Sequence, residues 1–537
     1  MGLPRRGIDP RRHLIKDAEP VPSPEGQKLM KEGQFGLEEW ESYPSRPNPL
    51  KLKRRHYIRL LEREIGAYRG ERARIGHQLL AQPLLPSTKA DFVMHHDAKC
   101  YSGQFSQDGN FFYSSSQDFR VRLYDSSNPY NWKHYKTVTY PGGRWTITDA
   151  TLSPDNKLLA YSSIDSTVYV SNTSSDMEET VALDFAARVR GNRNALQRGQ
   201  FGIWSIRFSG DGREMVAGAN DNNLYVYDIE TRTPVLKMSG HRNDVNAVCF
   251  ADVDSPHILF SGSDDTTLKV WDRRSMASGE VGVFCGHLEG LTYIDSKGDG
   301  RYVLSNAKDQ TMKLWDIRKM MSPSTFSKLK RTNYSSHYDY RSETYDYPPA
   351  RHPQDSSVVT YRSHSVLRTL IRCHFSPLTS SGSRYVYTGS SNGKVYIYNL
   401  DATIASIIDV YKATSGTRPW REELSYRYGG WGLGVPRWDT CVRDASWHPN
   451  AGVLAATGWN GYGASTGSVT LHAWGGGEKE EGEKEEGEDG PVRLNCWGKR
   501  DPILYRRSER VWEEAEENSE DDGFRRAMSY AVRGRLW

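Results

Sequence analysis

Two sets of side chains carry the residue types of a nucleophilic triad, and the second set repeats the first. They are His241, Ser261 and Asp265 with Trp271, and His287, Ser305 and Asp309 with Trp315. A hydrolase needs a Ser-His-Asp triad only once. Because the set recurs, we interpret it as a hydrogen-bond chain that ties a loop histidine through an aspartate and a serine to a strand tryptophan. Such a chain stabilises every repeat that contains it.

Metal and cofactor chemistry have weak support in the sequence. His95, His96 and Cys100 could form a metal site. However, His96 precedes the first strand of its repeat in the same way as His241 precedes the first strand of its own, which favours a role in a structural hydrogen-bond chain. The six cysteines form no CxxC pair and lie mostly in strand-like runs, as small buried residues do. Phosphate-loop, HExxH, GxSxG and kinase motifs are missing. We therefore expect no metal, no cofactor and no catalysis; an active site in a central channel is the weakest alternative.

The triads belong to a longer repeat, which defines the elements that position them. Residues 240–274 and 286–318 align over their whole length, and their Trp-Asp dipeptides begin at 271 and 315, 44 residues apart. A period of about 40 to 45 residues with a Gly-His start and a Trp-Asp end is typical of a four-stranded propeller blade. Weaker copies occupy 100–125, 146–172, 203–228, 370–399 and 442–474. The sequence predicts an all-β, seven-bladed WD-repeat β-propeller over residues 86–475, with 90–94 as the outer strand of the last blade.

Two insertions interrupt the repeat. Residues 319–355 follow the third strand of blade five, so we expect them to open on the bottom of the propeller. Residues 412–440 follow the fourth strand of blade six and should lie on the top. The second insertion contains Trp420 and Trp431 among several aromatics, which are either interface anchors or packed on the insertion itself.

Two dissimilar ends flank the ring. Residues 1–85 read as a mostly irregular extension with one amphipathic helix near 53–69, whose apolar stripe is Ile58, Leu61, Ile65 and Tyr68. That helix either packs on its own ring or inserts into a partner's groove. Residues 476–537 read as an acidic linker and a C-terminal tail, since 475–490 contain eight acidic residues and two lysines.

Composition limits the remaining classes. The net charge of +4 does not favour binding of nucleic acid or a membrane surface by the chain as a whole. The mean hydropathy of −0.71 comes without an apolar run of the length that crosses a bilayer, and no secretory signal is visible. KLKRRHYIR at 51–59 is a candidate nuclear localisation patch. We expect a protein of the nucleus and cytoplasm that does not contact nucleic acid directly.

Both strong repeats continue past Trp-Asp to an arginine, in Trp271-Asp272-Arg273-Arg274 and Trp315-Asp316-Ile317-Arg318. These runs resemble the WDxR box of receptors that dock on the damaged-DNA-binding adaptor of cullin-4 RING ubiquitin ligases. Runs such as NDVNAVCFAD (243–252), YIDSKGD (293–299) and LRTLIRCHFSP (367–377) narrow the resemblance to the group of cullin-4 associated factor eleven.

The resemblance implies a non-catalytic substrate receptor that presents proteins for ubiquitination and proteasomal degradation. Its partners would be the adaptor, cullin-4 and the RING subunit indirectly, and protein substrates. The implied adaptor contacts are Trp271, Asp272, Arg274, Trp315, Asp316 and Arg318, with the helical stripe Ile58, Leu61, Ile65 and Tyr68. Candidates for substrate contact on the top face are Arg372, Arg443, Asp444, Trp420 and Trp431, although Arg443 and Asp444 could satisfy each other within the ring. The alternative is a WD-repeat scaffold without a ligase.

Overall fold

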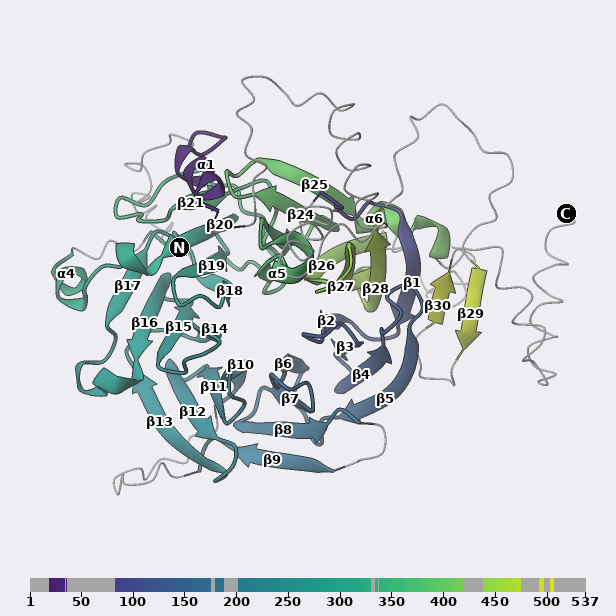
Figure 1. Ribbon diagram of the computed structural model, residues 1–537, viewed down its shortest axis with the longest axis horizontal. Coiled ribbons are helices and arrows are strands. Elements are labelled where there is room, and N and C mark those ends of the chain that lie inside the picture. The colour runs from purple at the N-terminus through teal and green to yellow at the C-terminus, as the bar shows by residue number, and fades with distance from the viewer. Residues whose placement is uncertain are drawn as a thin grey trace, which may run out of the picture.

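The computed structural model describes residues 19–33, 35, 83–174, 179–187, 201–329, 334–336, 338–418, 438–474, 492–496 and 503–506. Seven antiparallel sheets surround a common axis, and the first strand of each sheet faces the centre (Figure 1). The fold is the predicted seven-bladed propeller. We call the face that carries the loops between blades the top, and the opposite face the bottom.

The first three blades are formed by β2 (Cys100–Phe105) to β5 (Lys133–Thr139), by β6 (Ile147–Leu152) to β9 (Thr180–Asp184), and by β10 (Ile203–Phe208) to β13 (Thr233–Ser239). Their middle strands are β3 (Phe111–Ser116), β4 (Arg120–Asp125), β7 (Leu158–Ser163), β8 (Thr167–Asn172), β11 (Glu214–Ala219) and β12 (Asn223–Asp228).

The next three blades follow the same order. Blade four contains β14 (Val245–Phe250), β15 (Ile258–Ser263), β16 (Thr267–Asp272) and β17 (Gly282–Cys285). Blade five contains β18 (Leu291–Ser296), β19 (Tyr302–Ala307), β20 (Thr311–Asp316) and β21 (Val359–Tyr361). Blade six contains β22 (Cys373–Phe375), β23 (Tyr385–Gly389), β24 (Lys394–Asn399) and β25 (Ile404–Asp409).

Blade seven closes the ring with strands from both ends of the repeat. β26 (Trp438–Trp447), β27 (Val453–Tyr462) and β28 (Thr466–Ala473) are completed by β1 (Ala90–His96), which pairs antiparallel with β28 and places Met94 opposite Val469. Phe92, Val93 and Met94 of β1 are buried. The predicted latch is confirmed. β30 (Ile503–Arg506) and β29 (Val492–Cys496) extend this sheet to six strands, where the sequence predicts only linker and tail.

Local sequence explains the strands and their turns. All six residues of β14 are buried, because an inner strand packs between two neighbouring blades. The turn between β2 and β3 uses Asp108 to accept a hydrogen bond from Ser106 (2.5 Å), and Gly109 there has a φ of +79°. Glycine adopts that left-handed conformation without steric cost. Apolar side chains from adjacent blades form the core between the sheets.

Helical segments occur only outside the sheets in the described residues. They are α1 (Pro24–Lys31), η2 (Arg273–Ser278), η3 (Ile317–Lys319), α4 (Pro323–Lys328), α5 (Leu378–Ser381), α6 (Val410–Ala413) and η4 (Ser415–Thr417). The sequence did not predict α1. The helix predicted near 53–69 lies outside the described residues. The described residues contain no helix long and apolar enough to cross a membrane.

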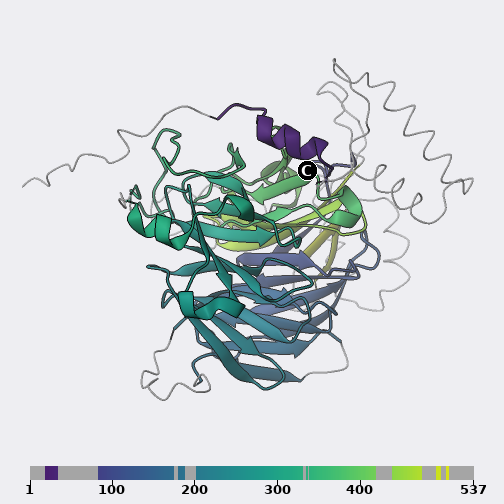
Figure 2. The ribbon, with the colours of Figure 1, turned by 60° about the vertical axis from the view of Figure 1, so that its left-hand side comes forward.

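Helix α1 and the residues after it dock on the ring at blades five and six. Ser23 caps α1 and donates its backbone N–H to the carbonyl of Asp401 (2.7 Å). A side chain at Gly26 would meet the carbonyl oxygen of Leu400 at 2.3 Å, so the helix lies directly against the backbone of the ring. Leu29 and Phe35 are buried in the same core cluster. Figure 2 shows α1 lying along the rim of the propeller.

The insertion at 319–355 begins at the bottom, as predicted, but does not stay there. Met321 pairs with Val283 of β17, and α4 buries Phe326 against that strand. Farther along, Ser335 and Ser336 bind Glu289, which lies in the loop between blades four and five on the top. The insertion therefore crosses the outer edge of blade four and reaches the opposite face before it returns to Asp355, which pairs with Lys313 of β20 at 2.5 Å. Strand order alone does not predict this path.

Candidate functional site

The repeated triads form the predicted structural chains. Trp271 Nε1 donates to Ser261 Oγ (2.8 Å), which lies 2.6 Å from His241 Nε2, while His241 Nδ1 lies 2.8 Å from Asp265. The second chain has the same order: Trp315 donates to Ser305 (2.8 Å), Ser305 contacts His287 (2.7 Å), and His287 contacts Asp309 (3.1 Å). Because each serine hydroxyl is already held by a buried indole, these chains stabilise the blades and are not arranged as nucleophiles.

His96 does not follow this pattern. Both of its ring nitrogens are buried without a hydrogen-bond partner among the described residues, as is Ser114 Oγ of the same blade. Arg122 of that blade instead pairs with Asp118 at 2.6 Å. The prediction that His96 belongs to an equivalent hydrogen-bond chain is wrong. Blade one has Tyr124 in place of the tryptophan, and its aspartate, Asp118, pairs with Arg122 and not with the histidine. Groups of three or more metal-ligating side chains were not found among the described residues.

The first Trp-Asp-x-Arg run lies at the bottom end of β16. Asp272 accepts from the backbone N–H of Arg274 (2.9 Å) and from its guanidinium at Nε (3.0 Å) and Nη2 (2.8 Å). The Arg274 side chain is 64 % exposed and its pair with Asp272 lowers the pKa of that carboxyl to about 2. Arg274 therefore lies at the surface, but its guanidinium is already paired with Asp272 of the same Trp-Asp-x-Arg run.

The second run differs in its electrostatics. The carboxylate of Asp316 accepts from the guanidinium of Arg301 at Nε (3.1 Å) and Nη2 (2.8 Å), and from the backbone N–H of Arg318 (3.0 Å). Arg318 is exposed, and no salt bridge joins its side chain to any carboxylate in the part of the chain that the structure describes. The two arginines are therefore not equivalent, and Arg318 is the one whose charge is available to a partner.

Of the other residues predicted to contact the adaptor, the two tryptophans are buried and the four residues of the helical stripe lie outside the described part of the chain. Trp271 and Trp315 are 0 % and 1 % exposed, so they hold the strands that carry the arginines and do not touch a partner directly. Ile58, Leu61, Ile65 and Tyr68 lie outside the described residues.

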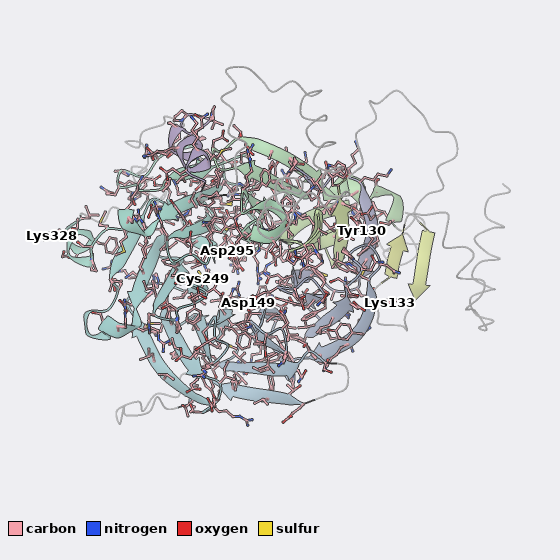
Figure 3. The ribbon with its side chains drawn as sticks, in the orientation of Figure 1. Tyr130, Lys133, Asp149, Cys249, Asp295 and Lys328 are labelled. Carbon is pink, nitrogen blue, oxygen red and sulfur yellow. The ribbon has the colours of Figure 1, made fainter. Side chains whose placement is uncertain are left out.

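A buried ionic network crosses the centre of the ring. Asp149 of blade two accepts from Arg207 of blade three (2.7 Å) and from Arg372 of blade six (2.7 Å). Arg207 also donates to the hydroxyl of Tyr293. Burial by itself raises the pKa of Asp149, but the two guanidiniums outweigh it and lower that pKa to about 2. Figure 3 places Asp149, Cys249 and Asp295 around the centre of the ring.

His374 extends the network towards blades five and seven. Its Nε2 lies 2.8 Å from Asp444 and its Nδ1 lies 3.7 Å from Asp295, while Arg372 reaches Asp444 at 3.4 Å. Burial by itself lowers the pKa of His374, but hydrogen bonds and charge interactions with both aspartates raise it to about 9. The imidazole is therefore a cation at neutral pH, held between two carboxylates.

These contacts account for three of the predicted substrate residues. Arg372, Arg443 and Asp444 are 2 %, 5 % and 0 % exposed. Arg443 donates to Thr369 (3.1 Å) and to the carbonyl of Tyr101. Their burial argues against direct contact with a substrate, because their polar atoms bind other parts of the ring. Trp420 and Trp431 lie outside the described residues.

Sequence reasoning missed Asp149 and Arg207, although one signal was present. Asp149-Ala150 and Asp444-Ala445 occupy the same position of the first strand in blades two and seven, and both aspartates bind Arg372. A repeated aspartate in a strand that faces the axis indicates an ionic contact there. The exposed Trp145, in the loop between blades one and two, was also missed.

The insertion forms the wall of a pocket of about 490 Å³ on the top of blades four and five. Phe326, Leu329 and Tyr334 line one side, and Arg242 and Asp264 lie among the ring residues opposite. The volume is in the range of small ligand sites. Its charged groups are largely engaged: Lys308 pairs with Asp264 at 2.7 Å.

Comparison with known proteins identifies the family. Residues 131–297 match the family described as nucleolar protein 10-like, N-terminal domain, and residues 88–125 match the WD domain, G-beta repeat. The LEC14B homolog of Prunus armeniaca is 43 % identical over 67 % of this chain and 70 % of its own length. The LEC14B protein of Lithospermum erythrorhizon is 42 % identical over 70 % and 74 %. The DDB1- and CUL4-associated factor 11 homolog of Caenorhabditis elegans is 32 % identical over 72 % of this chain and 62 % of its own.

These relatives match 67 to 72 % of the chain and confirm the group to which the sequence runs pointed. The chain belongs to the WD-repeat propeller family of LEC14B and the DDB1- and CUL4-associated factor 11 homologues.

Proposed function

We propose that the chain is a substrate receptor of a cullin-4 RING ubiquitin ligase and that it docks on the damaged-DNA-binding adaptor through its bottom face. The names of the Caenorhabditis relatives associate those proteins with DDB1 and CUL4. The receptor would contribute no catalytic group. It would raise the local concentration of a bound protein near the ubiquitin-loaded enzyme, which converts an encounter in solution into a tethered reaction.

The observation that carries the proposal is the exposed arginine pair at the bottom ends of β16 and β20. Arg274 and Arg318 occupy the same position in adjacent blades and both reach solvent. Arginine suits this role because its planar guanidinium binds carboxylates and carbonyls with fixed geometry. Phe35 lies on the same face, where it contacts Tyr302 at a centroid distance of 4.9 Å. Phe35 therefore adjoins the proposed docking surface.

The top face is then left for substrates, which would be targeted for proteasomal degradation. We further propose that the chain works in the nucleus and the cytoplasm, and the support for nuclear entry is the basic run at 51–59. Fluorescence imaging of the tagged chain with and without Lys53→Ala/Arg54→Ala/Arg55→Ala tests that point.

Affinity purification tests the receptor proposal. The tagged wild-type chain should copurify with the adaptor and cullin-4, and the Arg274→Asp/Arg318→Asp variant should not. Arg242→Asp is the matched control, because Arg242 is an exposed arginine on the opposite face. Circular dichroism of each variant establishes that the propeller is folded. If the wild-type chain brings down neither protein, the ligase proposal fails and the scaffold alternative replaces it.

A further inference from the structure

Four aromatic rings form a row on the top face, from blade seven to blade three. Trp459 lies 5.5 Å from Tyr101, Tyr101 lies 5.7 Å from Trp145, and Trp145 lies 6.3 Å from Trp204, measured between ring centroids. They belong to β27, to β2, to the loop before β6 and to β10. Figure 1 shows β2, β6 and β10 following one another around the centre of the ring.

The protein covers the first two rings with its own cations. Lys99 Nζ stands 4.3 Å from the centroid of Trp459, and the guanidinium of Arg443 stands 5.0 Å from that of Tyr101. These rings are 9 % and 2 % exposed. Cations are attracted to the electron-rich faces of aromatic rings at such distances.

The last two rings have no such cover. Trp145 is 53 % exposed, and its φ of +67° is a conformation that residues other than glycine rarely adopt. Strained residues persist where the surrounding structure enforces them, and they cluster at functional sites. The planes of Trp145 and Trp204 meet at 83°, so the two rings form a corner. Among the described residues, no lysine or arginine stands over either ring.

A carboxylate lies at this corner. Trp204 Nε1 donates to Asp244 at 3.1 Å. Two neighbouring aspartates have lysine partners, Asp221 with Lys237 (3.3 Å) and Asp264 with Lys308 (2.7 Å), whereas Asp244 has no salt bridge within the described part of the chain. Burial raises the pKa of Asp244 and repulsion from Asp264 adds to that effect, although the hydrogen bond from Trp204 and the charge of Lys308 partly oppose it. A cation placed here would give Asp244 the salt bridge that its neighbours Asp221 and Asp264 already have.

We propose that the corner formed by Trp145, Trp204 and Asp244 binds a lysine or arginine side chain of a substrate protein. The indole faces would receive the cation as Trp459 and Tyr101 receive Lys99 and Arg443, and Asp244 would supply the opposite charge. The identity of the ligand as a ubiquitination substrate rests on the proposed receptor function. The binding of a cationic side chain does not.

Binding of synthetic peptides to the purified full-length chain tests the proposal. The probes are labelled nine-residue libraries with a fixed central arginine, citrulline, lysine, acetyl-lysine or glutamate and degenerate flanks, measured by fluorescence anisotropy. Arginine should bind at least tenfold more tightly than citrulline, and lysine at least tenfold more tightly than acetyl-lysine. Citrulline and acetyl-lysine keep roughly the shapes of arginine and lysine but lack their positive charge.

Variants locate the effect. Trp145→Gly removes the ring and keeps a backbone conformation that glycine adopts freely, and Asp244→Asn retains an acceptor for Trp204 without the charge. Both should reduce the charge preference at least fivefold. Trp474→Ala is the matched control, because Trp474 is 58 % exposed and follows the bottom end of β28. Arg144→Ala should strengthen binding, because this exposed cation precedes Trp145 and repels a cationic ligand.

The proposal is overturned if charged and neutral libraries bind equally, if the glutamate library is preferred, or if Trp145→Gly keeps the full preference. Trp145→Gly should still bind the adaptor, which separates the two proposals. Loss of adaptor binding in the wild-type chain would remove the receptor function and leave the peptide result standing.

Discussion

At the scale of single residues, His374 gives the propeller a measurable pH dependence. Its pKa of about 9 in the folded protein exceeds its ordinary value of 6.5. The protonated form therefore stabilises the fold fully below pH 6.5, and this contribution is lost as the pH rises through 9. The whole effect is at most about 3.5 kcal/mol, because each tenfold increase in the proton affinity of the imidazole corresponds to about 1.4 kcal/mol.

Urea unfolding of the wild-type chain and of His374→Gln between pH 6 and 10 measures this contribution. The wild-type free energy of unfolding should fall relative to that of the variant between pH 6.5 and 9. Parallel curves for the two proteins would show that the imidazole is not held as a cation between Asp295 and Asp444.

The two surface arginines should also differ in a measurable way. Arg274 must leave a bidentate pair with Asp272 to meet a partner, whereas Asp316 is bound by Arg301 and leaves Arg318 available. We expect Arg318→Asp to weaken adaptor binding about tenfold more than Arg274→Asp, which corresponds to about 1.4 kcal/mol. Biolayer interferometry on the two single variants checks the order. Equal losses would mean that the Asp272 pair does not compete with docking.

At the scale of elements, Phe35 is the larger of two buried apolar side chains, with Leu29, that hold the segment containing α1 to the propeller. Phe35 is 2 % exposed, and Lys297 Nζ lies 4.4 Å from its centroid. Phe35→Ala should cost the docked state about 3 to 5 kcal/mol, the usual range for removing a buried phenylalanine. Hydrogen exchange of residues 24–31 should then increase while the blades keep their protection. Val21→Ala is the control, because Val21 is 62 % exposed. Unchanged exchange in Phe35→Ala would contradict this account of the docking.

Strands and their order were predictable because each blade repeats the same local rules. Alternating or fully apolar runs separated by short polar turns recur in all seven blades, with Asp-Gly or Asp-Asn in the turns of blades one, two, three and five. The latch followed from the missing outer strand of the last blade. Helix α1 was not predictable: eight residues with a proline at the start are too short for a stable isolated helix, and its stability comes from packing on Leu400 and Asp401.

At the scale of the whole molecule, contacts between residues far apart in the chain could not be predicted from the sequence. Arg372 was predicted to lie on the top surface because it stands at the start of a blade. That position is correct, but its guanidinium reaches across the axis to Asp149, 223 residues earlier. The WDxR runs, in contrast, lie on the bottom surface because a repeated strand end has the same place in every blade. Position within the repeat was therefore predictable, whereas the burial of side chains around the axis depended on all seven blades together.

Direct binding of the purified adaptor to the purified full-length chain tests the central claim, docking through the bottom face. We predict saturable binding by the wild-type chain and by Arg242→Asp, and at least a hundredfold weaker binding by the folded Arg274→Asp/Arg318→Asp variant. Equal affinity of the double variant and the wild-type chain would contradict docking through this face. Absence of binding by the wild-type chain would contradict the receptor function itself.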